Sequence, residues 1–287
     1  MDFEIVQDLY KAIMQYGPIE CHENEEARSR LSCRRSLNKI IELFSTAVTN
    51  KPEGLLESEV TQKGRIEHHF VALHSISVVF IEVKQVLTVG RELLDAKAQF
   101  LSRTCDYANA KRGYWVPILA ILCDGNNFIF FVYDSVDRVV HTSGWVRGIM
   151  CDTLGDKTDL LLSLKRTSEY LFDFFIMAYV NALRAFEERS SQRSKLTNKK
   201  RLSTEKWEQS LPAAENARWV LREAAVFANN RKYLAAEELA ERGVALLRKS
   251  LAALSPEALY PEYQDLLSLW DGSECLEVAF KGTNPLI

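Results

Sequence analysis

The sequence predicts an α/β fold in which a mixed sheet is flanked by helices and followed by a helical appendage. The run from Ser77 to Lys84 is apolar and rich in β-branched residues, which is typical of a buried strand. The apolar segments 119–123 and 128–130 surround residues 124–127, whose sequence Asp-Gly-Asn-Asn indicates a tight turn between two strands. Segments with helical spacing precede and follow this region, so strands and helices share one chain.

Composition narrows the class of protein. The chain has 287 residues, of which 47% are apolar and 26% charged, and this is ordinary for a globular protein. A net charge of −3 excludes a surface coated with basic residues, so any nucleic-acid contact must be local. The six cysteines contain no C-x-x-C pair, which excludes a paired-cysteine zinc site and favours a reducing compartment. With neither a secretory signal nor a membrane-length apolar run, we expect an intracellular protein of the nucleus or cytoplasm.

The elements expected in the first two thirds of the chain alternate between helix and strand. In chain order they are a helix at 36–49, strands at 55–61, 64–73 and 77–84, a helix at 91–111, and strands at 115–123, 128–133 and 139–146. The sequence Lys-Pro-Glu-Gly at residues 51–54 predicts the end of the first helix, because proline and glycine interrupt helical hydrogen bonding.

The last third is expected to be helical. Residues 158–189 have helical spacing with an aromatic face, and 191–203 form a polar, basic stretch that we interpret as a linker rather than a phosphate-binding or nuclear-import segment. Two amphipathic helices, at 213–229 and 232–253, then meet at Asn229-Asn230. The predicted organisation is therefore a domain at 1–190, the linker, and a small helical domain at 204–287, whose helices could bind a protein partner or a second copy.

Two carboxylates are predicted to face each other across neighbouring strands. Because side chains alternate along a strand, Glu82 and Lys84 share one face, while Ile81 and Val83 point into the core. An antiparallel hairpin centred between residues 74 and 75 places Glu67 opposite Glu82. Directly opposed residues have Cβ atoms roughly 4.5–5.5 Å apart, which lets two carboxylates share one divalent ion. The alternative is an ordinary solvated pair on an open sheet face, worth little energetically.

This pattern of an acid, a gap and Glu-x-Lys resembles the PD-(D/E)XK nuclease superfamily. Glu67 takes the place of the first acid, Glu82 and Lys84 match the second acid and the lysine, and Gln99 matches a glutamine in the following helix. The strand, turn and strand at 119–130 are similar to those that close the core of restriction-type members. The resemblance covers roughly residues 33–150. It departs from the family pattern in one respect, because the first acid is a glutamate preceded by isoleucine instead of an aspartate preceded by proline.

The resemblance implies a role for each matching residue. Glu67, Glu82 and the backbone carbonyl of Val83 would hold Mg²⁺ or Mn²⁺, Lys84 would orient water or stabilise the developing charge, and Gln99 would brace the site. His69 lies on the same predicted face, where it either fills the sheet surface, which we favour, or binds manganese. Phosphate contacts are expected from basic residues on and after the Gln99 helix, namely Lys97, Arg103, Lys111 and Arg112.

Two functions from different classes follow. The favoured function is metal-dependent hydrolysis of phosphodiester bonds in DNA, with RNA as the second substrate. The other is a catalytically silent scaffold that keeps this fold and binds nucleic acid or a protein, because folds outlive their chemistry. The intact carboxylates and lysine favour the enzyme, whereas the departure at the first acid and the overall negative charge favour the scaffold.

Overall fold

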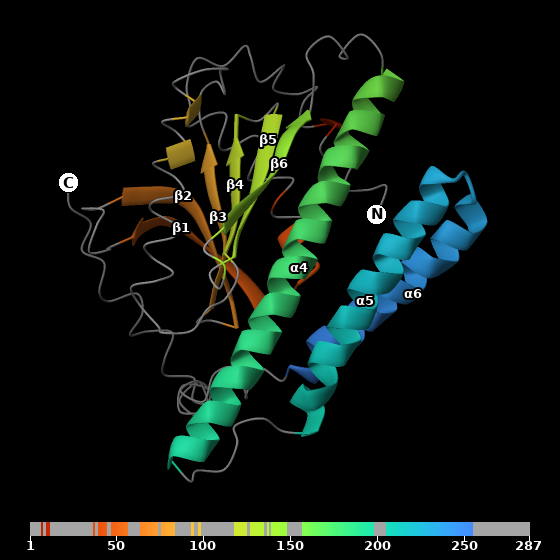
Figure 1. Cartoon of the computed structure of the whole chain (residues 1–287). Coiled ribbons are helices and arrows are strands. Elements are labelled where there is room, and N and C mark those ends of the chain that lie inside the picture. Colours follow the sequence, from red (N-terminus) through yellow and green to blue (C-terminus); the bar gives the residue numbers. More distant parts are fainter. Residues whose placement is uncertain are drawn as a thin grey trace, which may run out of the picture.

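We analysed a computed structural model of the whole chain (Figure 1). The structure describes residues 7, 10–11, 37, 40–44, 47–56, 64–73, 76–83, 93–94, 97–98, 118–124, 127–134, 137, 139–147, 157–197 and 205–254. Six strands are described: β1 (Val48–Leu56), β2 (Gly64–Ala72), β3 (Ile76–Val83), β4 (Ile118–Cys123), β5 (Asn127–Asp134) and β6 (Val139–Arg147). The long helices are α4 (Lys157–Thr197), α5 (Glu205–Asn229) and α6 (Tyr233–Ala253). None of the described helices is both long and apolar enough to cross a membrane.

The six strands form one mixed sheet in which spatial order follows chain order, from β1 to β6. Strands β3 and β4 are parallel, and every other neighbouring pair is antiparallel. Helix α4 crosses one face of the sheet (Figure 1). A parallel pair needs a crossover connection, and the usual right-handed crossover covers one sheet face. The predicted fold class, a mixed sheet with flanking helices and C-terminal helices, is confirmed.

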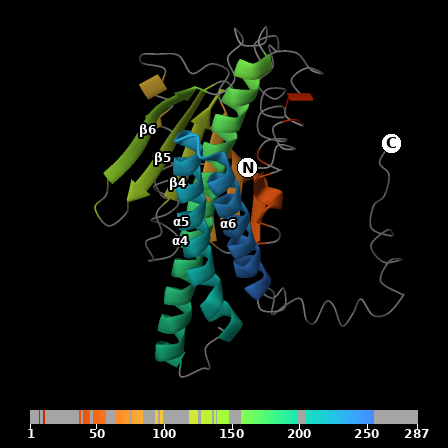
Figure 2. The same ribbon diagram turned by 90° about the vertical axis from the view of Figure 1, so that its right-hand side faces the viewer.

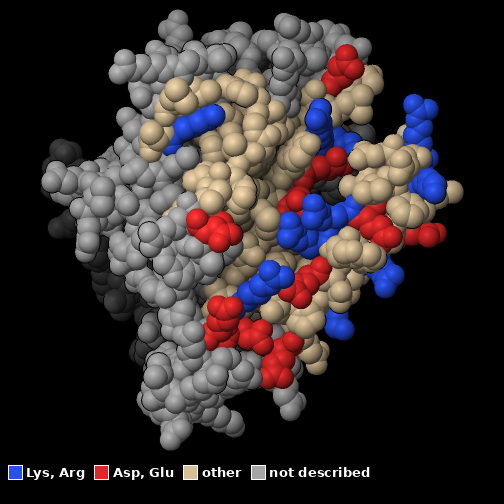
Figure 3. Space-filling model, viewed as in Figure 1, with Lys and Arg blue, Asp and Glu red and all other residues tan. Residues whose placement is uncertain are grey.

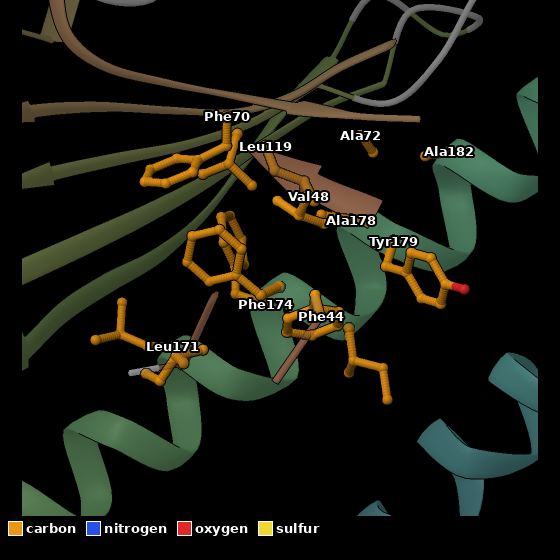
Figure 4. Packing of buried hydrophobic residues seen from close by; sticks show 14 of the residues in the cluster. Phe44, Val48, Phe70, Ala72, Leu119, Leu171, Phe174, Ala178, Tyr179 and Ala182 are labelled. Carbon is orange, nitrogen blue, oxygen red and sulfur yellow. The ribbon is translucent and has the colours of Figure 1, made fainter. Parts of the chain in front are cut away.

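The main core lies between the sheet and α4. Alternate residues of β3, namely Val79, Ile81 and Val83, are buried on this face, as strand alternation predicts. Figure 4 shows the rings of the core converging from the sheet and from α4. Phe175 of α4 meets Phe70 of β2 edge to face, with ring centroids 5.0 Å apart. Such pairs add about 0.5–1.5 kcal/mol beyond the effect of burying apolar area.

Helices α5 and α6 form the antiparallel hairpin that the sequence predicts, and the hairpin packs against α4 (Figure 2). Ala214, Ala217 and Leu247 of the hairpin belong to the same buried cluster as the sheet. At the surface, the Arg184 guanidinium of α4 donates to the Glu215 carboxylate of α5 at 2.7 Å. The appendage therefore shares its core with the sheet through α4.

The start of the sheet differs from the prediction. The chain enters β1 at Val48, where the sequence indicated a continuing helix, and residues 51–54 lie inside this strand instead of ending a helix. Proline lacks a backbone donor, but Pro52 is accommodated because β1 is an edge strand with a neighbour on one side only. Burial of Ala47 and Val48 and a 2.9 Å hydrogen bond from the Leu73 N–H to the Ala47 carbonyl hold this end of β1 in place.

The connection between β2 and β3 is also longer than predicted. Ala72 pairs with Ile76, so the connection contains three residues, and the pairing register shifts between Phe70 and Val71. Leu73 has a left-handed backbone with φ 48°, which is costly for a non-glycine residue. Residues 74–75 (His-Ser) lack the glycine or asparagine of a two-residue turn, and burial of the Leu73 side chain offsets the strain of the longer connection.

The predicted linker begins later than expected. Helix α4 contains 41 residues and continues to Thr197, so residues 191–197 are helical, and α5 begins at Glu205 rather than at residue 213. Basic and polar residues of this kind are good helix formers on a solvated surface, and composition alone did not separate a helix end from a linker. The division into two domains stays a prediction.

Candidate metal and nucleic-acid site

The predicted site residues fall at the far end of β2 and β3 from their connection. Glu67 lies in β2 and Glu82 in β3, and the structure describes the backbone but not the side chains of both. Val83 ends β3 and is buried. Lys97 belongs to the short helical segment 97–98 and is half-buried. Five predicted residues lie outside the described ones: Lys84, Gln99, Arg103, Lys111 and Arg112.

The backbone register of β2 and β3 bears directly on the predicted carboxylate pair. His68 pairs with Ile81, His69 with Phe80, and Phe70 with Val79. The next position outward in this register would oppose residues 67 and 82, and that opposition stays a prediction. The bulge near Phe70 compensates for the longer connection, so the register beyond it equals the predicted one despite the different turn.

Alternation places residues 67 and 82 on the sheet face opposite α4. The same face carries His69 and Phe80, whose rings stack with centroids 4.7 Å apart and an interplanar angle of 14°. His69 is only 5% exposed, so our expectation that it fills a solvated sheet surface is wrong. Phe80 covers its ring, and a stacked, buried histidine is held in one orientation.

This face is closed around the central strands. Phe80 and Leu122 are fully buried, and Ala120 is nearly so. Glu82 pairs with Leu122 in the parallel ladder between β3 and β4. Glu82 therefore has buried described neighbours on this face, and the two alternatives for its own side chain, a metal ligand and a solvated pair, stay predictions.

A further carboxylate, Asp124, lies at the same edge of the sheet. Because β3 and β4 are parallel, both end there, and alternation assigns Asp124 to the face of Glu82. Asp124 is 5% exposed, and its Oδ1 accepts a 2.7 Å hydrogen bond from the Asn127 N–H. The Asn127 side-chain amide donates to Oδ2 at 3.2 Å. The sequence indicated only a turn here, because the parallel pairing that brings Asp124 beside β3 has no local signal.

The residues at this edge match the chemistry of a hard divalent cation. Carboxylates and a backbone carbonyl supply the oxygen ligands that Mg²⁺ and Mn²⁺ prefer, and no thiolate is needed. Among the residues whose side chains the structure describes, no group of three or more His, Cys, Asp or Glu could hold a metal ion. The side chains of Glu67 and Glu82 are not among the described ones, so the predicted ligand set stays a prediction.

The charged surface of the helical side is mixed. Figure 3 shows acidic and basic side chains interspersed on the described part of this face. Individual pairs account for part of this pattern, such as the 2.6 Å contact between Lys165 Nζ and Glu169 Oε1 on α4. An interspersed surface does not attract a polyanion as a continuous basic field does. The described part of this face therefore presents no continuous basic field.

Comparisons with known proteins assign no family. No family model matches the chain, and no curated protein is significantly similar to it. A cryo-EM structure of a DrdV–DNA complex aligns over 92% of this chain and 29% of that chain, at 12% identity and a TM-score of 0.34. The chain thus spans less than a third of that protein, and the agreement is too low to assign a common fold.

Proposed function

We propose that the chain is a metal-dependent nuclease that hydrolyses phosphodiester bonds in DNA, with RNA as the second substrate. The observation that supports the proposal is the β2–β3 register from His68 to Phe70, whose continuation by one position would oppose residues 67 and 82. The resemblance of this acid pair and of Lys84 to the PD-(D/E)XK superfamily gives the chemistry. Two opposed carboxylates would otherwise lack an explanation, because two unpaired carboxylates repel each other.

Each residue of the proposed site has a defined task. Glu67, Glu82 and the Val83 carbonyl would bind Mg²⁺ or Mn²⁺, which when bound lowers the pKa of water and neutralises charge on a phosphate. Lys84 would donate hydrogen bonds to the attacking water or to the charge that develops on the phosphate oxygens. Gln99 would orient these groups from the following helix. Lys97, Arg103, Lys111 and Arg112 would contact phosphates and position the strand without reading its sequence.

The decisive test separates cleavage from binding. Glu82→Gln removes a negative ligand while keeping the shape of the side chain, so we expect Mg²⁺-dependent cleavage to fall at least about a thousandfold. Binding of the same DNA should be unchanged or tighter, because a negative charge facing the phosphates is lost. Lys84→Ala should also abolish cleavage but leave metal uptake, measured by calorimetry, in place. Glu188→Gln, an exposed position on α4, is the matched control and should leave both properties unchanged.

A silent binding scaffold is the second candidate. The observation that favours it is the exposed apolar surface of the helical hairpin, where Trp219 is 64% and Leu234 is 80% exposed. Large exposed apolar residues mark protein contacts when they gather in patches. If the unmodified protein takes up no Mg²⁺ or Mn²⁺ and cleaves neither single-stranded, duplex or branched DNA nor RNA, the enzyme proposal fails and the scaffold replaces it.

A further inference from the structure

We propose that a second copy of this chain binds along the outer face of α6, antiparallel to it. The contact surface is the outer ridge of α6, six exposed residues separated by alternating steps of four and three: Leu234, Glu238, Glu241, Ala245, Arg248 and Ala252. This spacing places all six on one stripe of the helix. The opposite stripe, with Gly243, Leu247 and Ser250, is buried against the rest of the molecule. The inference is independent of the proposed nuclease activity.

The charges of the outer ridge are divided between its two halves. Glu238 and Glu241 lie in the first half, with Glu237 beside them, and Arg248 lies in the second half beside Lys249. None of these five side chains forms an ion pair within the described part of the chain. The helix dipole favours acids at the start and bases at the end, but its effect is confined to the terminal turns. Glu241 lies near the middle of the 21-residue helix, beyond that range.

The charges on α6 are complementary to those of a second, antiparallel copy of the same helix. We place two copies of α6 antiparallel, with the two-fold axis at the level of Gly243. Two residues at the same height along the paired helices then have numbers that add up to 486. Within one residue of these positions, Glu238 meets Lys249 of the second copy on one flank of the contact, and Glu237 meets Arg248 of the second copy on the other flank. Leu234, 80% exposed, meets Ala252 of the second copy. By symmetry each contact occurs twice, which is the property of an isologous interface.

Small side chains make close approach feasible at the centre of the contact. Ala245 faces Glu241 of the second copy, next to the axis, so each small alanine leaves room for one longer glutamate. A polyanion is a poor occupant of the same surface, because the acidic half would repel it. A second copy is favoured over an unrelated protein because, in an antiparallel pair, the acidic half of one α6 lies against the basic half of the other. The occupant proposed is therefore another molecule of this chain.

The expected association is weak and salt-sensitive. A 21-residue helix is about 31 Å long, and one helix pair buries less area than a standard stable interface of about 800 Å² per partner. Exposed ion pairs contribute little individually and are screened by salt. The dimer should therefore form at high protein concentration and dissociate when ionic strength rises.

Sedimentation velocity of the full-length chain, over roughly a hundredfold range of protein concentration, tests the proposal. Glu238→Arg alone and Lys249→Glu alone should each lower the association constant about tenfold or more, because like charges then face each other twice. An equimolar mixture of these two variants should associate again, since each reversed position faces an opposite charge. The double variant Glu238→Arg/Lys249→Glu should also associate as the unmodified protein does.

Two controls use exposed charges outside the outer ridge, Glu188→Arg on α4 and Arg222→Glu on α5, and both should leave association unchanged. Circular dichroism confirms that each variant is folded. A protein that stays monomeric throughout the concentration range would overturn the proposal. So would a dimer that both single reversals leave intact, because its interface then lies elsewhere. Failure of the mixture to associate would exclude the antiparallel pairing.

Discussion

Helix α4 has two different interfaces, one with the sheet and one with the helical hairpin. Toward the sheet it presents apolar rings, with Phe174 and Phe175 packed against aromatic residues of the strands. Toward the hairpin it presents Tyr179, whose hydroxyl points to the neighbouring helices (Figure 4). That hydroxyl lies 2.9 Å from the Ser250 hydroxyl of α6. The first interface depends on apolar area, and the second depends on buried hydrogen bonds.

The hairpin interface is a small, satisfied polar network. The Ser210 hydroxyl donates to the Ser250 carbonyl at 3.0 Å, and the Ser250 hydroxyl donates to the Ser210 carbonyl at 2.8 Å. Both serine protons are thereby used, so the Tyr179 hydroxyl donates to the Ser250 oxygen. All three residues are fully buried. Because every donor has an acceptor, the network joins three helices without an unpaired buried group. The interfaces should consequently respond differently to mutation and to pH.

The largest effect on stability is expected at the sheet interface. Phe175→Ala removes a fully buried ring and should lower the free energy of unfolding by about 3–5 kcal/mol. Urea unfolding measures this value. Phe172→Ala on the same helix is the matched control and should cost less, because Phe172 is only partly buried. Equal losses of unfolding free energy at the two positions would mean that burial of the Phe175 ring does not stabilise the sheet interface more than the partly buried Phe172 ring does.

The hairpin interface should show a smaller loss and a dependence on alkaline pH. Tyr179→Phe removes one donor and leaves both serine pairs intact, so the expected cost near pH 7 is about 1 kcal/mol. Ser250→Ala should cost more, about 1–3 kcal/mol, because it leaves the buried Tyr179 hydroxyl without its acceptor.

The pH dependence follows from the same tyrosine. Burial raises the pKa of Tyr179 above its usual value, and the hydrogen bonds with Ser210 and Ser250 offset part of that rise. The unfolded chain therefore loses this proton at lower pH than the folded chain. Stability should be unaffected below about pH 9 and should fall as the pH rises through about 10. Unfolding curves of Tyr179→Phe should lack this part of the decline, and an identical decline in the variant would refute the assignment.

The smallest effect concerns the close approach of α5 and α6. A Cβ at Gly243 would lie 2.5 Å from Leu221 Cγ, so Gly243→Ala should cost about 1 kcal/mol after the gain in helix propensity is included. In a Leu221→Ala background the same change should be neutral or stabilising. Thermal unfolding of the four proteins provides the double-mutant cycle. Additive losses would show that the two positions do not touch.

The sequence by itself determined the elements whose patterns are local. Alternation along β3 predicted that Ile81 and Val83 enter the core, and the turn sequence at 124–127 predicted β4 and β5. Helical spacing predicted α4 and the hairpin, although it misplaced their ends. For the candidate site, counting outward from the turn predicted the register observed from His68 to Phe70, because side-chain period and pairing are properties of neighbouring segments. The opposition of residues 67 and 82 stays a prediction.

Only the tertiary structure decided the features that depend on distant segments. The pairing of β3 with β4 is parallel, and this buries the face that carries His69 and brings Asp124 to the edge beside Glu82. Pro52 lies within β1 because that strand is at the sheet edge, which no local pattern reveals. Ser210 lay before the predicted helix and Ser250 was an ordinary helix position, and only the tertiary structure joins them with Tyr179 of α4 in a buried network. Local periodicity specifies which side of an element is apolar, whereas burial and hydrogen-bond partners are set by what packs against that side.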